Sequence, residues 1–558
     1  MRRALAVAFV SCSSVAAAAL APGCGRKVAY PPPERYLAAD APLAVSVPAL
    51  GTAARQVGAL YRAVAQAPPA ASLGEAYGAV RAQLGFDPFD PRGLEQAGVD
   101  PAGAAAAALG AGRTALLVLP VLDLSRLDAT VARLARDRMG AAERVASRLQ
   151  GQEVVVFRRD AASPAALSYA AVGPHVLLAA GAKGPEAVAA AAQLPEDRSL
   201  QRSPLWARAR AAVGDGFLAT VLAPPGSPAA ADLHAARDGA ALGVRCGATS
   251  LGLRLALLLA PEREAWWNGL RGPAPAPAGT SEVGALAPDA AFVVRWGGDA
   301  AAARRLLPAL PPDVVRSLAA ARIDLERDLF PALGPGAAFS LSLAPTFTVT
   351  EFSSPRFDVR RTDPFRMLRL EAVLPVRDAA LLRALLARLQ KAAPRTGVTV
   401  VPRGPAAAPS AWTLSWGKAQ LGLSLAGDRL LVAGAAGRLQ ALAARAAAEG
   451  VGYAAPTEPA QAALTGGLGG VVLDVEHLAK SVAALPEEAY GTGPNAFVMR
   501  SLVSRYLEPA ASLAAVSARL DLVPGAAVVD LEVVGNPTAG GPAPGGPSAP
   551  SPPAPAKP

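Results

Sequence analysis

The sequence predicts an α+β protein built from two tandem copies of one module, each an antiparallel sheet with helices. A first repeated block, residues 119–123, opens a helical stretch, and a similar block at residues 374–378 opens another 255 residues later. A second block, residues 172–179, recurs at residues 426–433 with an offset of 254 residues. Two blocks that keep nearly the same offset indicate an internal duplication.

The sequence pattern predicts the same succession of strands and helices in both copies. An opening strand is followed by helices with apolar residues spaced near 3.6, a second strand and the repeated helix. A valine-rich strand, a hairpin, another helix and two closing strands complete each copy. In copy one these elements fall at residues 43–47, 60–84, 114–121, 122–134, 154–156, 172–179, 185–193, 242–249 and 251–259. In copy two they fall at residues 291–296, 306–318, 338–343, 377–389, 398–401, 426–433, 438–448, 512–522 and 525–534.

Short turns link the consecutive strands of each copy. Gly173 and Pro174 occupy the hairpin turn in copy one, and Gly427 and Asp428 occupy it in copy two. Strands that follow one another through such short turns pair antiparallel. We therefore expect an antiparallel sheet with its helices packed on one face.

The first 24 residues carry the signature of export. Arg2 and Arg3 precede an apolar run at residues 4–20, and the small residue Gly23 stands directly before Cys24. This layout is that of a secretory signal peptide, and it resembles the lipobox of bacterial lipoproteins. The resemblance implies an exported protein held at the cell envelope, by default at the outer membrane, through lipid on Cys24. A cleaved signal without lipid and an uncleaved anchor are the alternatives, although a membrane span takes about 20 apolar residues.

Composition marks the domain boundaries. Residues 272–279 contain only Gly, Pro and Ala, which predicts a stiff, extended linker. Residues 536–558 are rich in Pro, Gly, Ala and Ser, and such a tail buries too little apolar surface to become ordered. We expect a signal peptide, a membrane tether, module 1, a Pro/Ala linker, module 2 and a disordered tail. Their ranges are 1–23, 24–39, 40–271, 272–284, 285–535 and 536–558 in that order.

The net charge of +10 does not predict nucleic-acid binding. The basic residues are scattered, and no basic run interleaved with aromatic residues occurs. The cysteines fit export without disulfides, since Cys12 is lost with the signal and Cys24 carries lipid. Cys246 then stands alone, and we expect it to be a small buried side chain.

The histidines give little support to catalysis. His175 falls in a hairpin turn, where we expect it to be exposed. Asp474, Glu476 and His477 form the densest acid–histidine cluster, but they precede a helix, so capping explains the acids better than a metal or catalytic site does. No Gly-x-Ser-x-Gly, His-Glu-x-x-His or Cys-x-x-Cys motif occurs. We expect no enzymatic activity, no cofactor and no metal.

Copy two contains an insertion that copy one lacks. It spans roughly twenty residues between the strand that ends near Leu343 and the strand that begins near Met367. Aromatic residues and arginines, which are enriched at the centres of interfaces, gather there. The candidates for a partner surface are Phe347, Phe352, Phe357, Phe365, Arg356, Arg360 and Arg361. The alternative is an extended hairpin that packs its own phenylalanines on the module. We expect Trp266 and Trp267 to pack at the domain junction.

Three segments, residues 169–179, 199–206 and 323–334, combine helix caps, turns and apolar strands in a recognisable order. They resemble a family of bacterial envelope proteins, the domain-of-unknown-function family 3352. The likeness covers most of residues 40–535 and implies a duplicated α+β module outside the cytoplasm. It transfers no functional residue, because the family has no assigned activity.

These observations favour a non-enzymatic lipoprotein of the cell envelope that acts as a binding or scaffolding module. Its expected partners are the membrane, through the lipid on Cys24, and an envelope protein or lipid. The alternative is a periplasmic carrier or chaperone for an apolar ligand such as a lipid or a lipoprotein. A hydrolase is the third hypothesis, and it would require Asp474, Glu476 and His477 to gather in a cleft.

Overall fold

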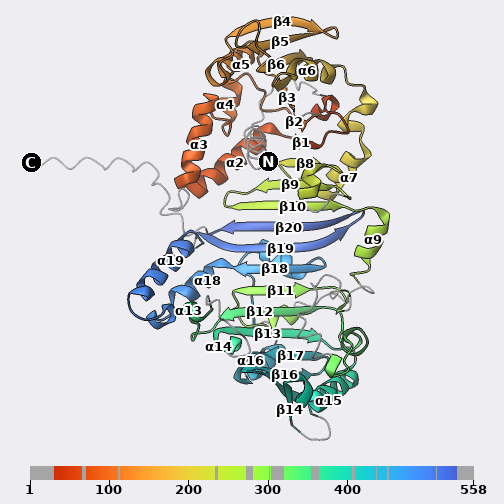
Figure 1. The fold of residues 1–558 in the computed structure, drawn as a ribbon, viewed down its shortest axis with the longest axis vertical. Helices are drawn as coiled ribbons and strands as arrows, with labels where there is room; N and C mark the ends of the chain where they lie inside the picture. The colour runs from red at the N-terminus through yellow and green to blue at the C-terminus, as the bar shows by residue number, and fades with distance from the viewer. Residues whose placement is uncertain are drawn as a thin grey trace, which may run out of the picture.

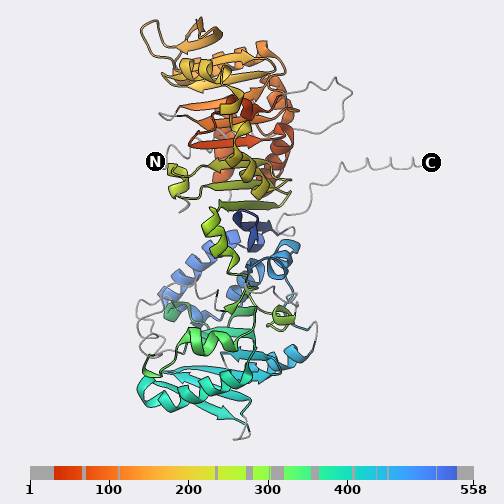
Figure 2. The same ribbon diagram turned by 90° about the vertical axis from the view of Figure 1, so that its right-hand side faces the viewer.

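The computed structural model describes residues 31–65, 71–110, 114–232, 237–271, 281–300, 302, 319–352, 363–404, 409–434, 436–448, 451–510 and 512–536. Its strands form one 20-stranded sheet, and all of their pairings are antiparallel. Figures 1 and 2 show an elongated molecule whose strands stack along its long axis, with helices beside the sheet. The predicted α+β class and antiparallel sheet are confirmed.

The strands divide into ten from each half of the chain. Those of the first half are β1 (Leu43–Val47), β2 (Ala105–Leu109), β3 (Ala115–Pro120), β4 (Glu143–Leu149), β5 (Gln152–Arg158), β6 (Leu167–Val172), β7 (His175–Ala180), β8 (Ala219–Ala223), β9 (Ala240–Cys246) and β10 (Ser250–Leu258). Those of the second half are β11 (Phe292–Trp296), β12 (Ala337–Leu343), β13 (Leu368–Pro375), β14 (Val398–Arg403), β15 (Ala411–Trp416), β16 (Ala419–Ala426), β17 (Arg429–Ala433), β18 (Gly469–Asp474), β19 (Leu513–Val523) and β20 (Ala526–Gly535).

The order of the strands across the sheet has a regular form. From one edge to the other it is β4-β5-β6-β7-β3-β2-β1-β8-β9-β10-β20-β19-β18-β11-β12-β13-β17-β16-β15-β14. Adding ten to the number of a first-half strand gives the strand that lies equally far from the centre on the other side. The halves meet where β10 pairs with β20, and Arg254 and Asp530 face each other at the middle of that register.

Helices accompany both halves of the sheet. In the first half they are α2 (Leu50–Ala65), α3 (Ala71–Leu84), α4 (Pro91–Gln96), α5 (Leu124–Met139), α6 (Gly184–Ala192), α7 (Pro204–Val213), α8 (Pro228–Asp232) and α9 (Pro261–Asn268). In the second half they are α10 (Ser281–Gly284), α13 (Val349–Phe352), α14 (Pro364–Met367), α15 (Ala379–Thr396), α16 (Ala436–Ala447), α17 (Glu458–Thr465), α18 (Val475–Ala483) and α19 (Pro494–Ala510). Short 3₁₀ or π turns lie at Pro33–Tyr36, Glu196–Arg198, Leu200–Arg202, Leu325–Leu329, Phe330–Ala332 and Glu487–Tyr490.

Helices pack on both faces of the sheet, so the expectation that they cover one face was wrong. Val154 of β5 lies in a buried cluster with residues of α6 and α7. Its neighbour Val155 points to the opposite face and joins a cluster with residues of α2, α4 and α5. The second half repeats this arrangement, with α16 and α17 on one face and α15 on the other. Strand β5 is apolar at consecutive positions, which is the pattern of a strand covered on both sides.

The repeated helix has the same ends in both halves. Asp123 caps α5 by accepting hydrogen bonds from the backbone N–H groups of Ser125 and Arg126, and Asp378 caps α15 in the same way. At the other end Gly140 and Gly397 adopt left-handed conformations with φ of 64° and 68°. Aspartate at the N-cap and glycine after the last turn are the residues that these two positions favour.

Several strands escape the sequence pattern, among them β2, β4, β8 and β15, and β2 shows the reason most clearly. Strand β2 consists of four alanines and a leucine, and it pairs with β1 and β3. Alanine is depleted in strands, so its local sequence gives no strand signal. Pairing with neighbours on both sides holds this segment in the sheet. Strand β12 occupies the corresponding position in the second half, between β11 and β13.

Candidate functional site in the central strands

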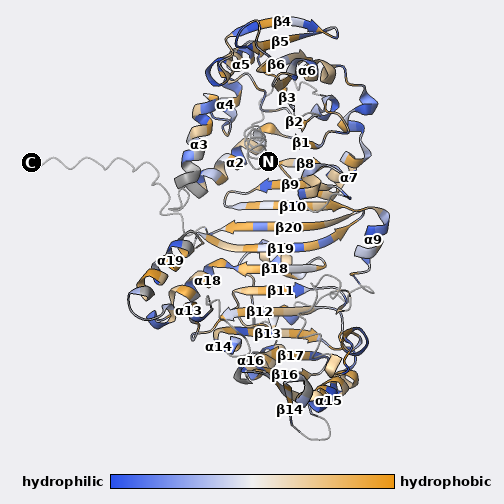
Figure 3. Cartoon of the chain, viewed as in Figure 1, coloured by the Kyte–Doolittle hydropathy of each residue, from blue (hydrophilic) through white to orange (hydrophobic). Residues whose placement is uncertain are grey.

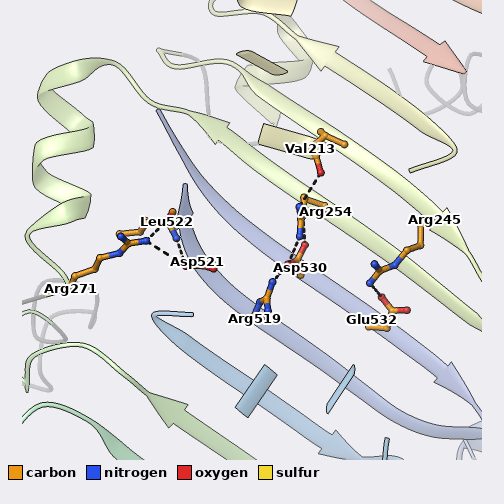
Figure 4. Close-up of polar contacts among 9 residues, drawn as sticks. All are labelled: Val213, Arg245, Arg254, Arg271, Arg519, Asp521, Leu522, Asp530 and Glu532. Atoms are coloured by element: carbon orange, nitrogen blue, oxygen red, sulfur yellow. Dashed lines mark hydrogen bonds and ion pairs between the residues drawn. The ribbon is translucent and has the colours of Figure 1, made fainter. Parts of the chain in front are cut away.

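The face of the central strands that α7 approaches carries charged side chains. Arg254 on β10, Asp530 on β20 and Arg519 on β19 stand side by side in register (Figure 4). Arg254 donates to both carboxylate oxygens of Asp530, with Nε–Oδ1 at 2.6 Å and Nη2–Oδ2 at 2.9 Å. Arg519 Nη2 donates to Oδ2 of the same carboxylate at 3.0 Å. One carboxylate therefore links three neighbouring strands.

The surroundings fix this group in place. Arg254 also donates to the carbonyl oxygen of Val213 at the end of α7, at 3.0 Å, and its guanidinium lies 5.3 Å from the ring centre of Phe217. Desolvation raises the pKa of Asp530, but the hydrogen bond and charge of Arg254, together with those of Arg519, outweigh it and lower the pKa. The carboxylate is thus ionised at neutral pH between two arginines.

A second ion pair runs beside the first. Arg245 on β9 reaches across β10 to Glu532 on β20, with Nη2–Oε2 at 2.8 Å. Gly252 is the residue of β10 that lies between them, and a Cβ there would sit 2.5 Å from Glu532 Oε2 and 2.8 Å from Arg245 Nε. Only a glycine leaves room for this bridge. We call Arg245, Arg254, Arg519, Asp530 and Glu532 the central charge ladder.

The opposite face of the same strands is apolar. One row of side chains follows the register across six neighbouring strands, and a second row lies beside it. The first row is Leu253, Leu531, Ala518, Val471, Val294 and Phe339. The second row is Val533, Val516, Leu473, Phe292 and Leu341, and Val529 lies next to Leu531 on the same face. We call these residues the apolar strip.

The apolar strip is less buried than the opposite face of the same strands. All of its residues are half-buried or exposed, and Val529 and Phe339 are 37% and 36% exposed. None of them belongs to, or packs against, the buried clusters found among the described residues. By contrast, Val293 and Val472 on the other face are fully buried. Figure 3 shows long hydrophobic stretches in these strands.

The chemistry of the strip is restricted to apolar contact. Its side chains have no hydrogen-bonding groups, and the strands that carry them are paired on both sides. Cys246, the last residue of β9, lies on the same face and is 7% exposed, as expected for a small buried side chain. Burial, with Glu532 nearby, raises the pKa of its thiol to about 11, so it supplies no thiolate at neutral pH.

An aromatic cluster and a helical lobe flank the two long sides of the strip, beyond its rows in the direction of the strands. Trp267 of α9 and Trp296 of β11 pack in a cluster with Leu259, Leu270 and Leu522. This cluster joins residues of both halves, which agrees with the packing expected for Trp267 at the junction. Trp266 is 42% exposed. On the other side, α18 and α19 follow β18 and form a helical lobe (Figure 1).

The predicted partner surface falls partly within this lobe. Phe347 packs against a cluster that contains Tyr490 and Ala496. The ring of Phe365 lies against Gly434, where a Cβ would be 2.7 Å from it. Both rings pack on the protein itself, as the alternative hypothesis expects. The side chain of Phe352 and the residues Arg356, Phe357, Arg360 and Arg361 lie outside the described part of the chain.

His175 is fully buried, so its predicted exposure at a hairpin tip was wrong. The residue begins β7 and pairs with Pro120 of β3, and its ring meets that of Tyr36 edge-on at 5.5 Å. Tyr36 comes from a turn far away in the sequence, which covers this end of the hairpin. Burial lowers the pKa of His175 to about 4, so the imidazole is neutral at pH 7.

The residues of the acid–histidine cluster lie at the start of α18, where they make a helix cap and an ion pair. Asp474 caps this helix by accepting a hydrogen bond from the backbone N–H of His477 at 2.8 Å, which confirms the capping prediction. Glu476 pairs with Lys480 at 2.5 Å and accepts a hydrogen bond from Asn536 at 3.2 Å. The described part of the chain brings together no group of three or more His, Cys, Asp or Glu side chains fit to hold a metal.

The predicted lipidation residue, Cys24, lies outside the described residues, as do His234, the linker at 272–280 and the tail beyond Asn536. None of the described helices has both the length and the apolar character needed to cross a bilayer.

Comparison with known proteins gives little guidance. No family model matches the chain, and no curated protein matches it. A solved structure of TP0453, in crystal form III, aligns with 45% of this chain and 91% of its own length. Its sequence identity is 9% and its TM-score is 0.24. The resemblance to family 3352 stays a prediction.

The buried imidazole predicts a pH-dependent stability. Unfolded His175 binds a proton near pH 6.5, whereas folded His175 binds one only near pH 4, so stability falls as the pH drops through this window. We expect the unfolding free energy of the wild type to drop by about 2 kcal/mol more than that of His175→Phe between pH 7 and pH 5, measured by urea unfolding. His477→Gln should keep the wild-type profile. Parallel profiles for wild type and His175→Phe would refute this account.

The central charge ladder predicts a second effect on stability. Asp530→Asn leaves the guanidinium groups of Arg254 and Arg519 without their shared anion, and we expect a loss of about 1–3 kcal/mol at pH 7. Because the folded pKa of Asp530 is lowered, this contribution exists above the usual carboxyl pKa and disappears as the pH falls below it. The exposed pair Glu196–Arg202 supplies the control, since Glu196→Gln should cost less than about 1 kcal/mol. Equal losses in the two variants, measured by urea unfolding, would contradict the prediction.

Proposed function

We propose that the protein is a non-enzymatic binding module of the bacterial cell envelope, and that the apolar strip is its binding surface. The observation that carries this proposal is a two-row apolar surface on the central strands whose side chains lie outside the buried clusters formed by the described residues. A contiguous exposed apolar patch on a protein is typically a site of interaction. The strip also favours the second candidate, a carrier of apolar ligands, over a purely scaffolding role.

We further propose that two copies of one module, residues 40–271 and 285–535, arose by duplication. The strand order supports this proposal, because it runs outward from the β10–β20 pair in the same sequence of connections on both sides. The matching caps of α5 and α15 support it as well. The joined halves place the strip at the centre of the molecule, with strands contributed by both.

Export and lipid attachment at Cys24 complete the proposal. The apolar run at residues 4–20 and the Gly23–Cys24 pair support it. A lipid on Cys24 would hold the binding surface near a bilayer, through a tether at residues 24–39. The hydrolase hypothesis gains no support, since Asp474 and Glu476 are engaged in capping and pairing.

The anchor has a direct test. In the producing bacterium, Cys24→Ser should abolish incorporation of labelled palmitate into the protein and shift it from the membrane fraction to the soluble fraction. Cys12→Ser is the matched control, because this cysteine lies inside the predicted signal. Undiminished labelling of Cys24→Ser would remove the lipid anchor from the proposal.

The binding surface is tested with the fluorescent apolar probe 1-anilinonaphthalene-8-sulfonate. The folded full chain should bind it saturably, and Val529→Glu combined with Phe339→Glu should weaken binding about tenfold, because the carboxylates repel the sulfonate and remove apolar contact in both parts of the strip. Val451→Glu provides the control, since Val451 is 61% exposed and lies outside the strip. An unaltered titration for the double variant, with its circular dichroism unchanged, would overturn the assignment of the surface.

A further inference from the structure

We propose that the outer face of α19 is a second contact surface of the protein, which binds the anionic phospholipids of a bilayer. This face lies outside the rows of the apolar strip, and binding there goes beyond the proposed function. Three observations carry the proposal: apolar side chains exposed together on one helix, two arginines without partners on the same face, and the alternation of the two kinds of side chain around the helix.

The inner side of α19 is packed on the protein. The helix lies against α18 and the turn at Glu487–Tyr490, and α18 in turn lies against the sheet. Ala496 is 4% exposed, and Met499 and Val503 pack against the same buried cluster. Figure 1 shows α19 at the flank of the molecule, with α18 between it and the strands. The opposite side of the helix is therefore turned to the surface.

The outer face of α19 exposes large apolar side chains. Phe497 is 74% exposed, Val498 is 53% exposed and Leu502 is 43% exposed. Twelve large apolar residues are exposed in the described part of the chain, and these three fall within six consecutive positions of one helix. Single exposed apolar residues are ordinary on a protein surface, whereas a group of them on one face is typical of a contact site.

Two arginines on the same face lack counter-ions. Arg500 and Arg505 line a groove of about 390 Å³, and the rest of its lining is Glu487, Phe497, Ser501 and Ser504. Neither guanidinium makes an ion pair or a hydrogen bond with any residue that the structure describes. Two arginines and one glutamate leave the lining with a net charge of +1. This charge, with hydroxyl groups beside it, complements an anionic group such as a phosphate.

The order of the side chains around the helix favours a bilayer over a protein partner. At about 100° per residue, the outer face runs in angular order Arg500, Ser504, Phe497, Ser501, Arg505, Val498 and Leu502. Arg505 therefore stands between Phe497 and Val498. A bilayer separates charge from hydrocarbon by depth, so arginine stems reach back to the phosphates while the apolar side chains enter below them. A protein partner would have to bury carboxylates among apolar groups to match this pattern, at a cost in desolvation.

A second copy of this chain fits the face poorly. A two-fold axis would bring Arg500 and Arg505 of both copies together, with four arginines against two copies of Glu487. Like charges that face each other across an interface repel. The net charge of +10 also repels a second copy, whereas it attracts the chain to an anionic surface.

The test uses the full chain with Cys24→Ser, the parent protein, so that no attached lipid holds it on a membrane. The parent is mixed with vesicles of phosphatidylethanolamine and phosphatidylglycerol, or of phosphatidylcholine alone, and bound protein is measured by flotation. It should float with the anionic vesicles and much less with the neutral ones, and salt should weaken the anionic binding. Residues 1–23 are the same in every variant, so a difference between variants reports on α19.

Two double variants separate the apolar contribution from the charge. Phe497→Ser with Leu502→Ser removes apolar contact, and Arg500→Gln with Arg505→Gln removes both cations. Each should weaken binding to the anionic vesicles about tenfold. All four residues are exposed, so the urea midpoint of each variant should equal that of the parent.

Each double variant has a matched control. Leu122→Ser with Leu124→Ser removes two leucines that are 54% and 44% exposed at the start of α5. Arg210→Gln with Arg383→Gln removes the same charge from exposed positions on α7 and α15. Both controls should bind the anionic vesicles as the parent does.

A fluorescent label locates the contact on α19 itself. When Cys12 and Cys24 are replaced by serine, Val498→Cys adds an exposed thiol, and the remaining Cys246 is only 7% exposed. Emission from a bimane on this thiol should shift to shorter wavelength when anionic vesicles are added. The same label at Val451→Cys, a position that is 61% exposed outside α19, should not respond.

Several results would overturn the inference. Undiminished binding by both α19 variants, an equal loss in the controls or a silent label at position 498 places the contact elsewhere. Equal flotation of the parent with anionic and neutral vesicles removes the role of the arginines. A parent dimer that dissociates with Phe497→Ser and Leu502→Ser, seen by sedimentation, assigns the face to a second copy. Probe binding at the apolar strip is measured separately, so the proposed function does not depend on these results.

Discussion

The whole structure depends on the antiparallel pairing of β10 with β20. Without it the two halves would each expose a long strand edge, a ready template for pairing with other chains. Pairing removes both edges and makes one sheet of all the described strands. The charge ladder specifies the register: a slip of one residue would turn Arg254 or Asp530 toward the apolar face and leave its partner unpaired. The same register aligns the rows of the apolar strip, so the joint that holds the halves together also builds the candidate binding surface.

Local signals in the sequence were sufficient for much of the fold. The repeated blocks that end in Asp123 and Asp378 gave the positions of α5 and α15, and in the structure both aspartates cap the helices that follow, an interaction that depends on neighbouring residues alone. The turns at Gly173 and Gly427 located two hairpins for the same reason. Strand β2 was missed because four alanines carry no strand preference, and its conformation is imposed by the strands on either side.

The site was harder to foresee, because it depends on which distant segments cover a strand. The alternating leucines of β10 predict an apolar face, but the pattern is the same whether that face is packed or open. His175 shows the converse: its place after a turn suggested exposure, and Tyr36 from a remote segment covers it. Charged residues in the middle of apolar strands, such as Arg254 and Asp530, were the signal in the sequence that could have located the joint.

The central strands depart from the usual division of an antiparallel sheet, because charged residues are buried among apolar ones on one face while apolar residues are partly exposed on the other. Such a sheet normally packs its apolar face on the core and turns its polar face to water. Here Glu532 and Ser517 are buried on the face that carries the ladder, while Val529 and Phe339 are exposed on the apolar face. Burying charge requires pairing to offset desolvation, and Arg245 and Arg254 provide it. Leaving apolar side chains in water has no such compensation within the described chain. An apolar occupant would supply it, which is the physical reason for proposing the strip as a binding surface.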